Sequence, residues 1–566
     1  MFGKTAGEAL VDLLIDWGVE HIYGMPGDSI NSIIEALRKK QDKIKFIQVR
    51  HEEAGALAAA AYAKLTGKLG VCTAIAGPGA IHLLNGLYDA KLDKAPVLAI
   101  SGQVETDLLG TDFFQEVNLE RLFDDVAVYN QRIMSAEQLP AVVNQAIRMA
   151  YTKKGVSVLT IPDDVPKFEV KNGARVTNTS FTLPELFPQE EDLHAAILAI
   201  NEAKKPVILA GKGAKHARES LLTFAEHIGA PIVLTLPAKG IIPDEHPLCI
   251  GGLGLIGTKP SYDAMKHADT LIMVGTSYPF TGFLPEKAKT IHIDTDPAQI
   301  GKRYVTDIGL AGDADKTLKW LIENVEKHED HSFLEHHQEM MKKWEEKLHN
   351  QEDDSSTPIK PQRVMHALQH VAHDDAILSV DVGNVTVWTA RHFRMTNQQF
   401  IISSWLATLG CGLPGALAGK IAFPDKQVFA VCGDGGFGMT MNDFVTAVKY
   451  KLPIIVVVLN NNKIAMIKFE QEVMGNIEFG TDLTNPDFAK YAEACGGIGY
   501  RVEHIDELLP AFENAVKQNK PCIIDVVVDA NEAPMPAKIT FGQAAGYTKH
   551  MIKELFEEGE IDLPPL

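Results

Sequence analysis

The sequence contains no apolar run of about 18 residues, the length that a helix needs to cross a bilayer. It also lacks an excess of lysine and arginine, because its formal net charge is −20, and this disfavours sequence-independent binding to nucleic acid. Residues 1–18 carry acids within an apolar pattern, which predicts an amphipathic helix and not a signal peptide. We therefore expect a cytoplasmic protein that does not bind nucleic acid.

Cysteine clusters and dinucleotide fingerprints are missing too. The six cysteines are scattered, without a CxxC pair or a Cys/His cluster, and this predicts reduced core thiols rather than a zinc site or a disulfide framework. No strand pattern leads into a full GxGxxG, so an NAD-dependent dehydrogenase fits poorly. Short-period repeats and low-complexity tracts are absent as well.

What the chain does have is length and apolar content. Its 566 residues, 46% of them hydrophobic, suffice for three or four domains of about 150 residues each. Polar or proline-containing stretches at residues 161–180 and 351–358 read as linkers, and a histidine-rich helical stretch lies at residues 318–348. Short apolar runs alternate with helical patterns throughout. We predict an α/β protein with three doubly wound parallel-sheet domains, at residues 1–175, 188–335 and 362–535, and a tail at residues 536–566.

The most informative motif is a GDGG run that follows a buried-strand pattern at residues 427–432. Asn461 follows the next strand pattern, at residues 452–459, so both polar clusters are expected at the carboxyl ends of neighbouring parallel strands. Glycines let backbone N–H groups approach an anion, and two side-chain oxygens suit Mg²⁺ bound to a diphosphate. The alternative is an ordinary βαβ turn with a capping aspartate. The residues predicted to bind the cofactor are Gly433, Asp434, Gly435, Gly436 and Asn461.

This strand–GDGG–helix–strand–NN arrangement resembles the diphosphate-binding motif of the thiamine diphosphate enzymes. The resemblance implies that Mg²⁺ takes the side chains of Asp434 and Asn461 and the backbone carbonyl of Lys463. Glu52, in the run RHEE, is read from the residues alone as either a helix cap or a functional carboxylate. In the family the matching glutamate hydrogen-bonds the aminopyrimidine ring and stabilises the tautomer that takes a proton, which implies a catalytic role for Glu52.

The same resemblance places further residues around the reacting carbon. Leu409 lies 25 positions before Asp434 and matches the bulky apolar residue that holds the cofactor in its folded shape. A second segment, DFFQE, resembles a loop that lines the substrate pocket. His82 is interpreted as a core histidine. The residues implied to face the reacting carbon are Phe114, Gln115, Met466 and Glu470.

Nearly the whole chain resembles the pyruvate oxidases, and the quinone-linked bacterial pyruvate:menaquinone oxidoreductases especially. The segments that carry this include VRHEE, AGPGAIHLLNGLYDA, LPAKGIIPD, HIDTDPAQIGKRY and SSWLATLGCGLPGA. The resemblance implies a Rossmann-like middle domain that binds FAD; the GxG at residues 211–213 is weak evidence alone, and an empty or ADP-filled cleft is the alternative. The implied FAD contacts are Gly213, Lys239, Gly275, Asp294, Asp296, Arg303 and Asp313.

The implied activity is oxidative decarboxylation of pyruvate to acetate or acetyl phosphate and CO₂, with thiamine diphosphate, Mg²⁺ and FAD. Electrons would pass to menaquinone, ubiquinone or oxygen. One alternative is a carboligase of the acetolactate synthase type. Another is a non-catalytic nucleotide-binding protein, which would have no need for Glu52, Asp434 and Asn461 together. In the family the block that carries Glu52 faces the diphosphate block of a neighbouring chain, which implies a dimer as the minimum active unit. A tetramer is common in the family, and we expect a homotetramer.

The C-terminal tail leaves two interpretations open. Residues 547–556 place Met551, Ile552, Leu555 and Phe556 on one helical stripe. In quinone-linked relatives a C-terminal segment mediates reversible membrane contact, which implies peripheral binding at the inner face of the cell membrane. The stripe is short, however, and acidic residues follow it, so a helix packed on its own protein is the other interpretation.

Overall fold

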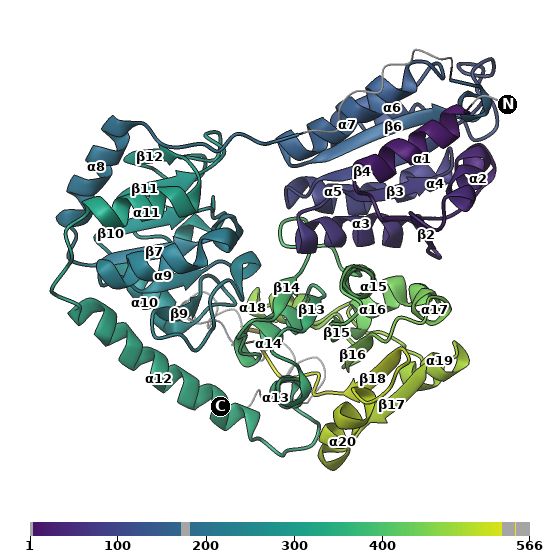
Figure 1. Cartoon of the computed structure of the whole chain (residues 1–566). Coiled ribbons are helices and arrows are strands. Elements are labelled where there is room, and N and C mark those ends of the chain that lie inside the picture. Colours follow the sequence, from purple (N-terminus) through teal and green to yellow (C-terminus); the bar gives the residue numbers. More distant parts are fainter. Residues whose placement is uncertain (1–3, 171–180, 535–548, 551–566) are drawn as a thin grey trace.

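A computed structural model describes residues 4–170, 181–534 and 549–550, and it contains three parallel six-stranded sheets with helices on their faces (Figure 1). This confirms the predicted α/β class with three doubly wound sheets. The exact domain limits and the cofactor assigned to each domain stay predictions. Within the described ranges, no helix is both long enough and apolar enough to span a bilayer.

The first sheet has the strand order β2-β1-β3-β4-β6-β5. Its strands are β1 (His21–Gly24), β2 (Lys45–Gln48), β3 (Gly70–Ala74), β4 (Val97–Gln103), β5 (Ala127–Arg132) and β6 (Val156–Pro162). The α-helices around it are α1 (Ala6–Asp16), α2 (Asn31–Lys39), α3 (Glu52–Thr66), α4 (Pro78–His82), α5 (Leu84–Leu92), α6 (Leu119–Leu122) and α7 (Leu139–Lys153). Helix α1 confirms the amphipathic helix predicted near the N-terminus.

The middle sheet has the order β12-β11-β10-β7-β8-β9. Its strands are β7 (Pro206–Ala210), β8 (Ile232–Leu234), β9 (Cys249–Gly252), β10 (Thr270–Val274), β11 (Lys289–Asp294) and β12 (Ile308–Ala311). The α-helices are α8 (Glu190–Asn201), α9 (Arg218–His227), α10 (Lys259–His267), α11 (Ala314–Asn324) and α12 (Ser332–Glu352). Helix α12 runs from the middle sheet toward the third, and we call it the linker helix (Figure 1).

The third sheet has the order β14-β13-β15-β16-β18-β17. Its six strands, counted along the chain, are therefore arranged across the sheet in the same order as those of the first sheet. Its strands are β13 (Ile377–Val380), β14 (Gln399–Ile401), β15 (Val428–Gly433), β16 (Ile455–Asn460), β17 (Ile498–Val502) and β18 (Cys522–Val527). The α-helices are α13 (Pro361–Val371), α14 (Asn384–His392), α15 (Gly412–Ala422), α16 (Asp434–Thr440), α17 (Phe444–Lys449), α18 (Ala465–Val473), α19 (Phe488–Ala494) and α20 (Ile505–Ala515).

Helix α3 explains how the first and third sheets fit together. Its run of alanines is buried on every side, because α5 packs against one flank and α15 of the third domain against another. Small side chains are needed at such close approaches: a Cβ on Gly86 of α5 would lie 2.5 Å from the Cβ of Ala56. One hydrophobic core therefore spans the first and third domains, whereas the middle domain has cores of its own.

Helix α16 begins at Asp434 directly after strand β15, so the GDGG run opens a helix. One local prediction needs correction. The histidine-rich stretch predicted as one helix consists of two: α11 ends at Asn324, and α12 begins at Ser332. Val325 adopts an extended conformation, and the Asp330 carboxylate accepts the N–H of Ser332 at 2.9 Å in a local turn, so non-helical backbone separates α11 from α12.

The cysteine prediction is confirmed, since all six are free thiols and five of them are buried. The first predicted linker lies partly, and the apolar stripe of the tail wholly, outside the described residues. From the tail, the structure describes only Lys549 and His550. His550 is buried, and its Nδ1 lies 2.7 Å from the carbonyl oxygen of Asn476.

Candidate active site

Asp434 is buried as the first residue of α16, at the carboxyl end of β15. One carboxylate oxygen accepts the N–H of Gly435 at 3.0 Å, and the other accepts the N–H of Asn462 at 2.7 Å and the amide of Asn485 at 2.8 Å. Burial raises the pKa of Asp434 to about 6. No basic side chain in the described part of the chain lies within ion-pair distance of it. A buried carboxylate without a cationic partner fits a divalent cation, which would supply the missing positive charge.

Asn461 lies at the same edge of the sheet as Asp434. It follows β16, which pairs directly with β15, and its neighbour Asn462 donates to Asp434. The side-chain oxygen of Asn461 accepts the N–H of Lys463 at 3.0 Å. The ammonium group of Lys463 pairs with Glu478 and Asp482, both at 2.7 Å, which leaves its backbone carbonyl as the group for the predicted role. This set of oxygens suits Mg²⁺, and the assignment of ligands remains a prediction.

The glycines beside Asp434 have two different roles. A Cβ at Gly433 would meet no atom within 4 Å, so open space lies next to the carboxylate, as an incoming diphosphate requires. A Cβ at Gly436 would instead lie 2.8 Å from the carboxylate of Asp381. Gly436 is therefore needed because α16 packs directly on a buried acid.

Asp381 is a buried residue that the sequence analysis missed. It follows strand β13, and its carboxylate accepts the N–H groups of Val382 at 2.8 Å, Gly410 at 2.9 Å and Gly412 at 3.3 Å. It thus fixes the segment that carries Leu409 against the start of α16. Burial raises the pKa of Asp381 to about 6, against the lowering effect of these three hydrogen bonds.

We expect Asp381→Asn to change how stability depends on pH. Because the pKa of Asp381 in the folded protein is about 6, against 3.8 as its ordinary value, its stabilising contribution is complete below 3.8 and is lost as pH rises through 6. The shift corresponds to about 3 kcal/mol. The asparagine has no proton to lose, so the variant should gain stability relative to the wild type between pH 4 and pH 8.

Thermal unfolding of both cofactor-free proteins across this pH range measures the effect. The quantity to follow is how the difference between the two Tm values changes with pH. The amide also loses a hydrogen bond, but that loss is the same at every pH and does not affect this change. Parallel pH profiles would show that Asp381 does not titrate in this range.

Glu52 is the buried first residue of α3. One of its carboxylate oxygens lies 3.0 Å from Nδ1 of His82, whose ring stacks on that of His51 at a centroid distance of 4.3 Å. A Cβ at Gly79 would lie 3.1 Å from the other oxygen, so this glycine leaves room for the carboxylate. The interpretation of His82 as a core histidine is wrong, because its side chain is 42% exposed and it contacts Glu52.

The loop that contains Phe114 and Gln115 is tightly organised although it is exposed. The carboxylate of Glu116 accepts the N–H groups of Gly110 at 2.6 Å and Phe113 at 3.2 Å. Gln115 has a positive φ of 65°. A Cβ added to Gly77, the residue just before α4, would lie 2.9 Å from the carbonyl oxygen of Gln115. The loop therefore adjoins the helix that carries His82. Phe114 is 75% exposed, which fits a side chain that meets a ligand or a second chain.

Leu409, Met466 and Glu470 come from two segments of the third domain. Leu409 is half-buried and lies between Gly410, held by Asp381, and Thr408, whose hydroxyl accepts the amide of Asn85 at 2.8 Å. Met466 and Glu470 are four residues apart on α18, so they share one face of that helix. Met466 is half-buried and Glu470 is exposed.

Six of the seven predicted FAD contacts lie at or beyond the carboxyl ends of the neighbouring strands β7, β10, β11 and β12. Gly213 and Gly275 approach each other closely, with the N–H of Gly213 donating to the carbonyl of Gly275 at 3.1 Å. Asp294 ends β11, and its carboxylate accepts the N–H of Asp296 at 2.9 Å. Ligands of doubly wound sheets collect at such an edge.

Three of these six side chains also make contacts that tie the edge to its surroundings. Asp296 pairs with Lys94 of the first domain at 3.1 Å. Arg303 donates to the carbonyl of Ser277 at 2.9 Å, and its guanidinium lies 4.7 Å from the ring centroid of Trp405 in the third domain. Asp313 lies 2.7 Å from Nε2 of His216. All three domains therefore meet at this edge.

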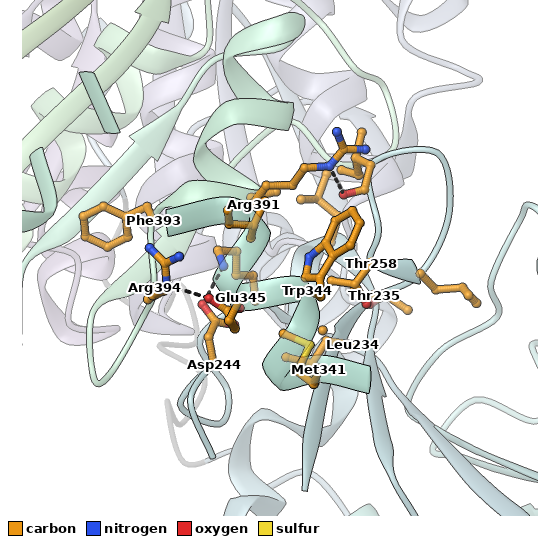
Figure 2. A pocket seen from close by; sticks show the side chains of 18 residues that line it. Leu234, Thr235, Asp244, Thr258, Met341, Trp344, Glu345, Arg391, Phe393 and Arg394 are labelled. Atoms are coloured by element: carbon orange, nitrogen blue, oxygen red, sulfur yellow. Dashed lines mark hydrogen bonds and ion pairs between the residues drawn. The ribbon is translucent and has the colours of Figure 1, made fainter. Parts of the chain in front are cut away.

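Lys239 follows the carboxyl end of β8, the strand next to β7, but it lines a separate cavity. Its side chain is only 9% exposed and pairs with Asp244 at 2.5 Å. It lines a cavity of about 50 Å³ between strand β9, the linker helix and α14 (Figure 2). Among described residues, Trp344 Nε1 and Arg394 Nη2 are buried there without a hydrogen-bond partner, so the cavity suits ordered water or a polar ligand.

Comparison with protein families agrees with this three-part arrangement. Residues 4–122 match the family described as thiamine pyrophosphate enzyme, N-terminal TPP binding domain. Residues 193–321 match the central domain of the thiamine pyrophosphate enzymes, and residues 381–526 match the C-terminal TPP binding domain.

Known proteins that resemble the chain cover almost all of it. YdaP of Bacillus subtilis (strain 168), whose name assigns it provisionally to the thiamine pyrophosphate-containing proteins, is 54% identical over 100% of this chain and 99% of its own length. A pyruvate oxidase of Lactiplantibacillus plantarum is 40% identical over 94% of this chain and 90% of its own. A probable acetolactate synthase large subunit of Methanococcus aeolicus is 33% identical over 95% and 94%. The chain therefore belongs to the thiamine pyrophosphate enzyme family.

Proposed function

We propose that the protein catalyses the oxidative decarboxylation of pyruvate with thiamine diphosphate, Mg²⁺ and FAD. The observation that carries this proposal is the 40% identity to a pyruvate oxidase across 94% of the chain. In balanced form, pyruvate, water and FAD give acetate, CO₂ and FADH₂; phosphate in place of water gives acetyl phosphate. Menaquinone, ubiquinone or oxygen then takes the electrons from the reduced flavin.

The proposed roles of the residues follow from their surroundings. When bound, thiamine diphosphate supplies a carbon nucleophile and an electron sink, and FAD supplies a two-electron acceptor. Asp434 and Asn461, with the carbonyl of Lys463, hold the metal and through it the diphosphate. Glu52 holds a proton against the cofactor's pyrimidine ring, and His82, 3.0 Å away, positions that carboxylate.

The remaining predicted residues shape the pocket. Leu409 supports the folded shape of the cofactor. Phe114 and Gln115 from the first domain, with Met466 and Glu470 from α18, cover the reacting carbon and exclude water from it. In this proposal the active unit is a homotetramer, in which the first domain of one chain faces the third domain of a neighbour. Membrane contact through the tail belongs to the same proposal.

A second candidate is an acetolactate synthase-type carboligase. It is supported by two probable acetolactate synthase large subunits, which are 33% and 34% identical over 95% and 93% of this chain. The oxidase is preferred because its identity is higher over a similar share of the chain. A non-catalytic nucleotide-binding protein is the weaker alternative, because it would have no need for the buried acids Glu52 and Asp434.

Anaerobic addition of pyruvate to the enzyme loaded with thiamine diphosphate, Mg²⁺ and FAD tests the proposal. We expect the yellow flavin absorbance to bleach, with one CO₂ and one acetate or acetyl phosphate formed per flavin. The rate of colour recovery after adding oxygen or a menaquinone analogue then identifies the acceptor. Formation of acetolactate without bleaching would favour the carboligase, and failure to bind FAD would contradict the oxidase.

A further inference from the structure

The linker helix carries a pair of histidines for which the proposed active site has no use. His336 and His337 are consecutive on α12, and Asp263 lies on α10, which packs against α12. One possible ligand atom from each of the three side chains lies within 4.8 Å of the other two. His337 is buried, Asp263 is half-buried and His336 is exposed. Two imidazoles and a carboxylate therefore converge on elements that hold none of the predicted cofactor contacts.

The hydrogen bonds of His337 fix its tautomer. Its Nδ1 lies 2.8 Å from the carbonyl oxygen of Phe333, and a carbonyl can only accept, so Nδ1 carries a proton. Its Nε2 faces the Asp263 carboxylate at 3.3 Å. In the neutral ring this places a lone pair against a negative oxygen, unless a proton or a cation lies between them.

The distance between His337 Nε2 and Asp263 Oδ2 is also compatible with a bridging metal ion. A charge-assisted hydrogen bond between imidazolium and carboxylate is typically about 2.7–2.9 Å long. Two ligands bound to one tetrahedral zinc ion, each about 2.0–2.1 Å from it, lie about 3.3 Å apart. The separation of Nε2 and Oδ2 is 3.3 Å. A metal-binding histidine also usually donates its other N–H to a carbonyl or carboxylate, as His337 does to Phe333.

We propose that Asp263, His336 and His337 form a binding site for a divalent transition-metal ion, with zinc as the best match. Imidazole and carboxylate ligands suit zinc and its first-row neighbours better than Mg²⁺, which prefers oxygen alone. Three protein ligands leave a fourth position for water, and the exposed ring of His336 gives the ion a path in from solvent. Nearby, Nδ1 of His267 lies 2.9 Å from the backbone carbonyl of Asp263 and 3.3 Å from its Oδ2. This nitrogen therefore donates a hydrogen bond to Asp263 and is not a ligand.

The ion would fasten the linker helix to the middle domain. Helix α12 leads from the middle domain to the third domain, whereas α10 belongs to the middle domain alone (Figure 1). A metal held by both helices would fix the direction in which the chain leaves the middle domain. This role is structural, so it does not depend on the reaction that the enzyme catalyses.

The test is a zinc titration of chelator-treated, tag-free enzyme saturated with thiamine diphosphate and Mg²⁺, followed by calorimetry and by Tm. We expect the wild type to bind one more zinc ion per chain than His336→Gln, and only the wild type to gain Tm from that ion. Asp263→Asn should weaken the same binding at least about 10-fold. His349→Gln is the matched control, because His349 lies on the same helix with its Nδ1 2.8 Å from a backbone carbonyl, that of Glu345.

Equal zinc binding by the wild type and His336→Gln would overturn the proposal, and so would the absence of zinc binding by the wild type. The His336 ring is exposed and makes no hydrogen bond within the described part of the chain, so its variant should fold even if Asp263→Asn does not. Cobalt gives a second readout, since its visible spectrum reports ligand number. That spectrum should appear in the wild type and His349→Gln, and it should be lost in His336→Gln.

Discussion

Replacing Glu52 with glutamine is expected to reduce pyruvate turnover by about 10²- to 10⁴-fold, the range typical for loss of a positioned acid–base group. Glutamine has nearly the same shape and still accepts a hydrogen bond, but it cannot exchange a proton with the cofactor. The side chain is buried at the start of α3, where it forms a hydrogen bond with His82 that glutamine can also make, so the fold should survive. The measurement is the rate of anaerobic flavin bleaching with pyruvate, beside a thermal melt.

Glu53→Gln is the matched control for this experiment. Glu53 is the next residue, and its carboxylate accepts a hydrogen bond from the amide of Asn85 on α5 at 2.6 Å. Glu53 therefore binds a different helix from Glu52, whose carboxylate contacts His82 on α4. It should keep most of the wild-type turnover. If Glu52→Gln also kept near-normal turnover, Glu52 would lose its proposed catalytic role.

The second large effect is expected for Asp434→Asn, which should weaken Mg²⁺-dependent binding of thiamine diphosphate at least about 100-fold. Even partners outside the ligand shell of a metal cost about 10- to 100-fold when removed, and Asp434 is proposed as a direct ligand. The amide oxygen can still accept the N–H of Asn462 and the amide of Asn485, so only the hydrogen bond from Gly435 is lost and the sheet edge should stay folded. Calorimetric titration of cofactor at fixed Mg²⁺ measures the change.

Asp425→Asn controls for the loss of one negative charge, because Asp425 is exposed and follows α15 of the same domain. It should bind the cofactor like the wild type. Unchanged affinity in Asp434→Asn would instead remove this residue from the metal site, and with it the central assignment for the third domain.

The strands were predictable because buried parallel strands are short apolar runs that end in turn residues. The patterns at residues 427–432 and 452–459 correspond to β15 (Val428–Gly433) and β16 (Ile455–Asn460). Their shared edge followed from the parallel arrangement, and the hydrogen bond from Asn462 to Asp434 confirms that the two clusters meet. The start of α16 was not predictable in the same way, since three glycines in its first five residues oppose a helix, and only packing on Asp381 explains Gly436.

Contacts between distant segments could not be predicted. His82 and Glu52 are 30 residues apart, and nothing in either segment shows that α4 brings the imidazole to the start of α3. Asp381 had a weak signal, because it follows a strand pattern as Asp434 does. A single aspartate at a strand end is common, however, and its partners Gly410 and Gly412 lie about 30 residues away in the chain.

The shared core of the first and third domains makes the middle domain an insertion between two halves that already fit together. Hydrophobic packing of α3 against α15 joins those halves, while polar pairs such as Lys94 with Asp296 and Arg303 over Trp405 connect the middle domain to them. A module that shares no hydrophobic core with its host can be exchanged without opening that core. The middle domain is therefore free to diverge while the packing between the first and third domains stays the same.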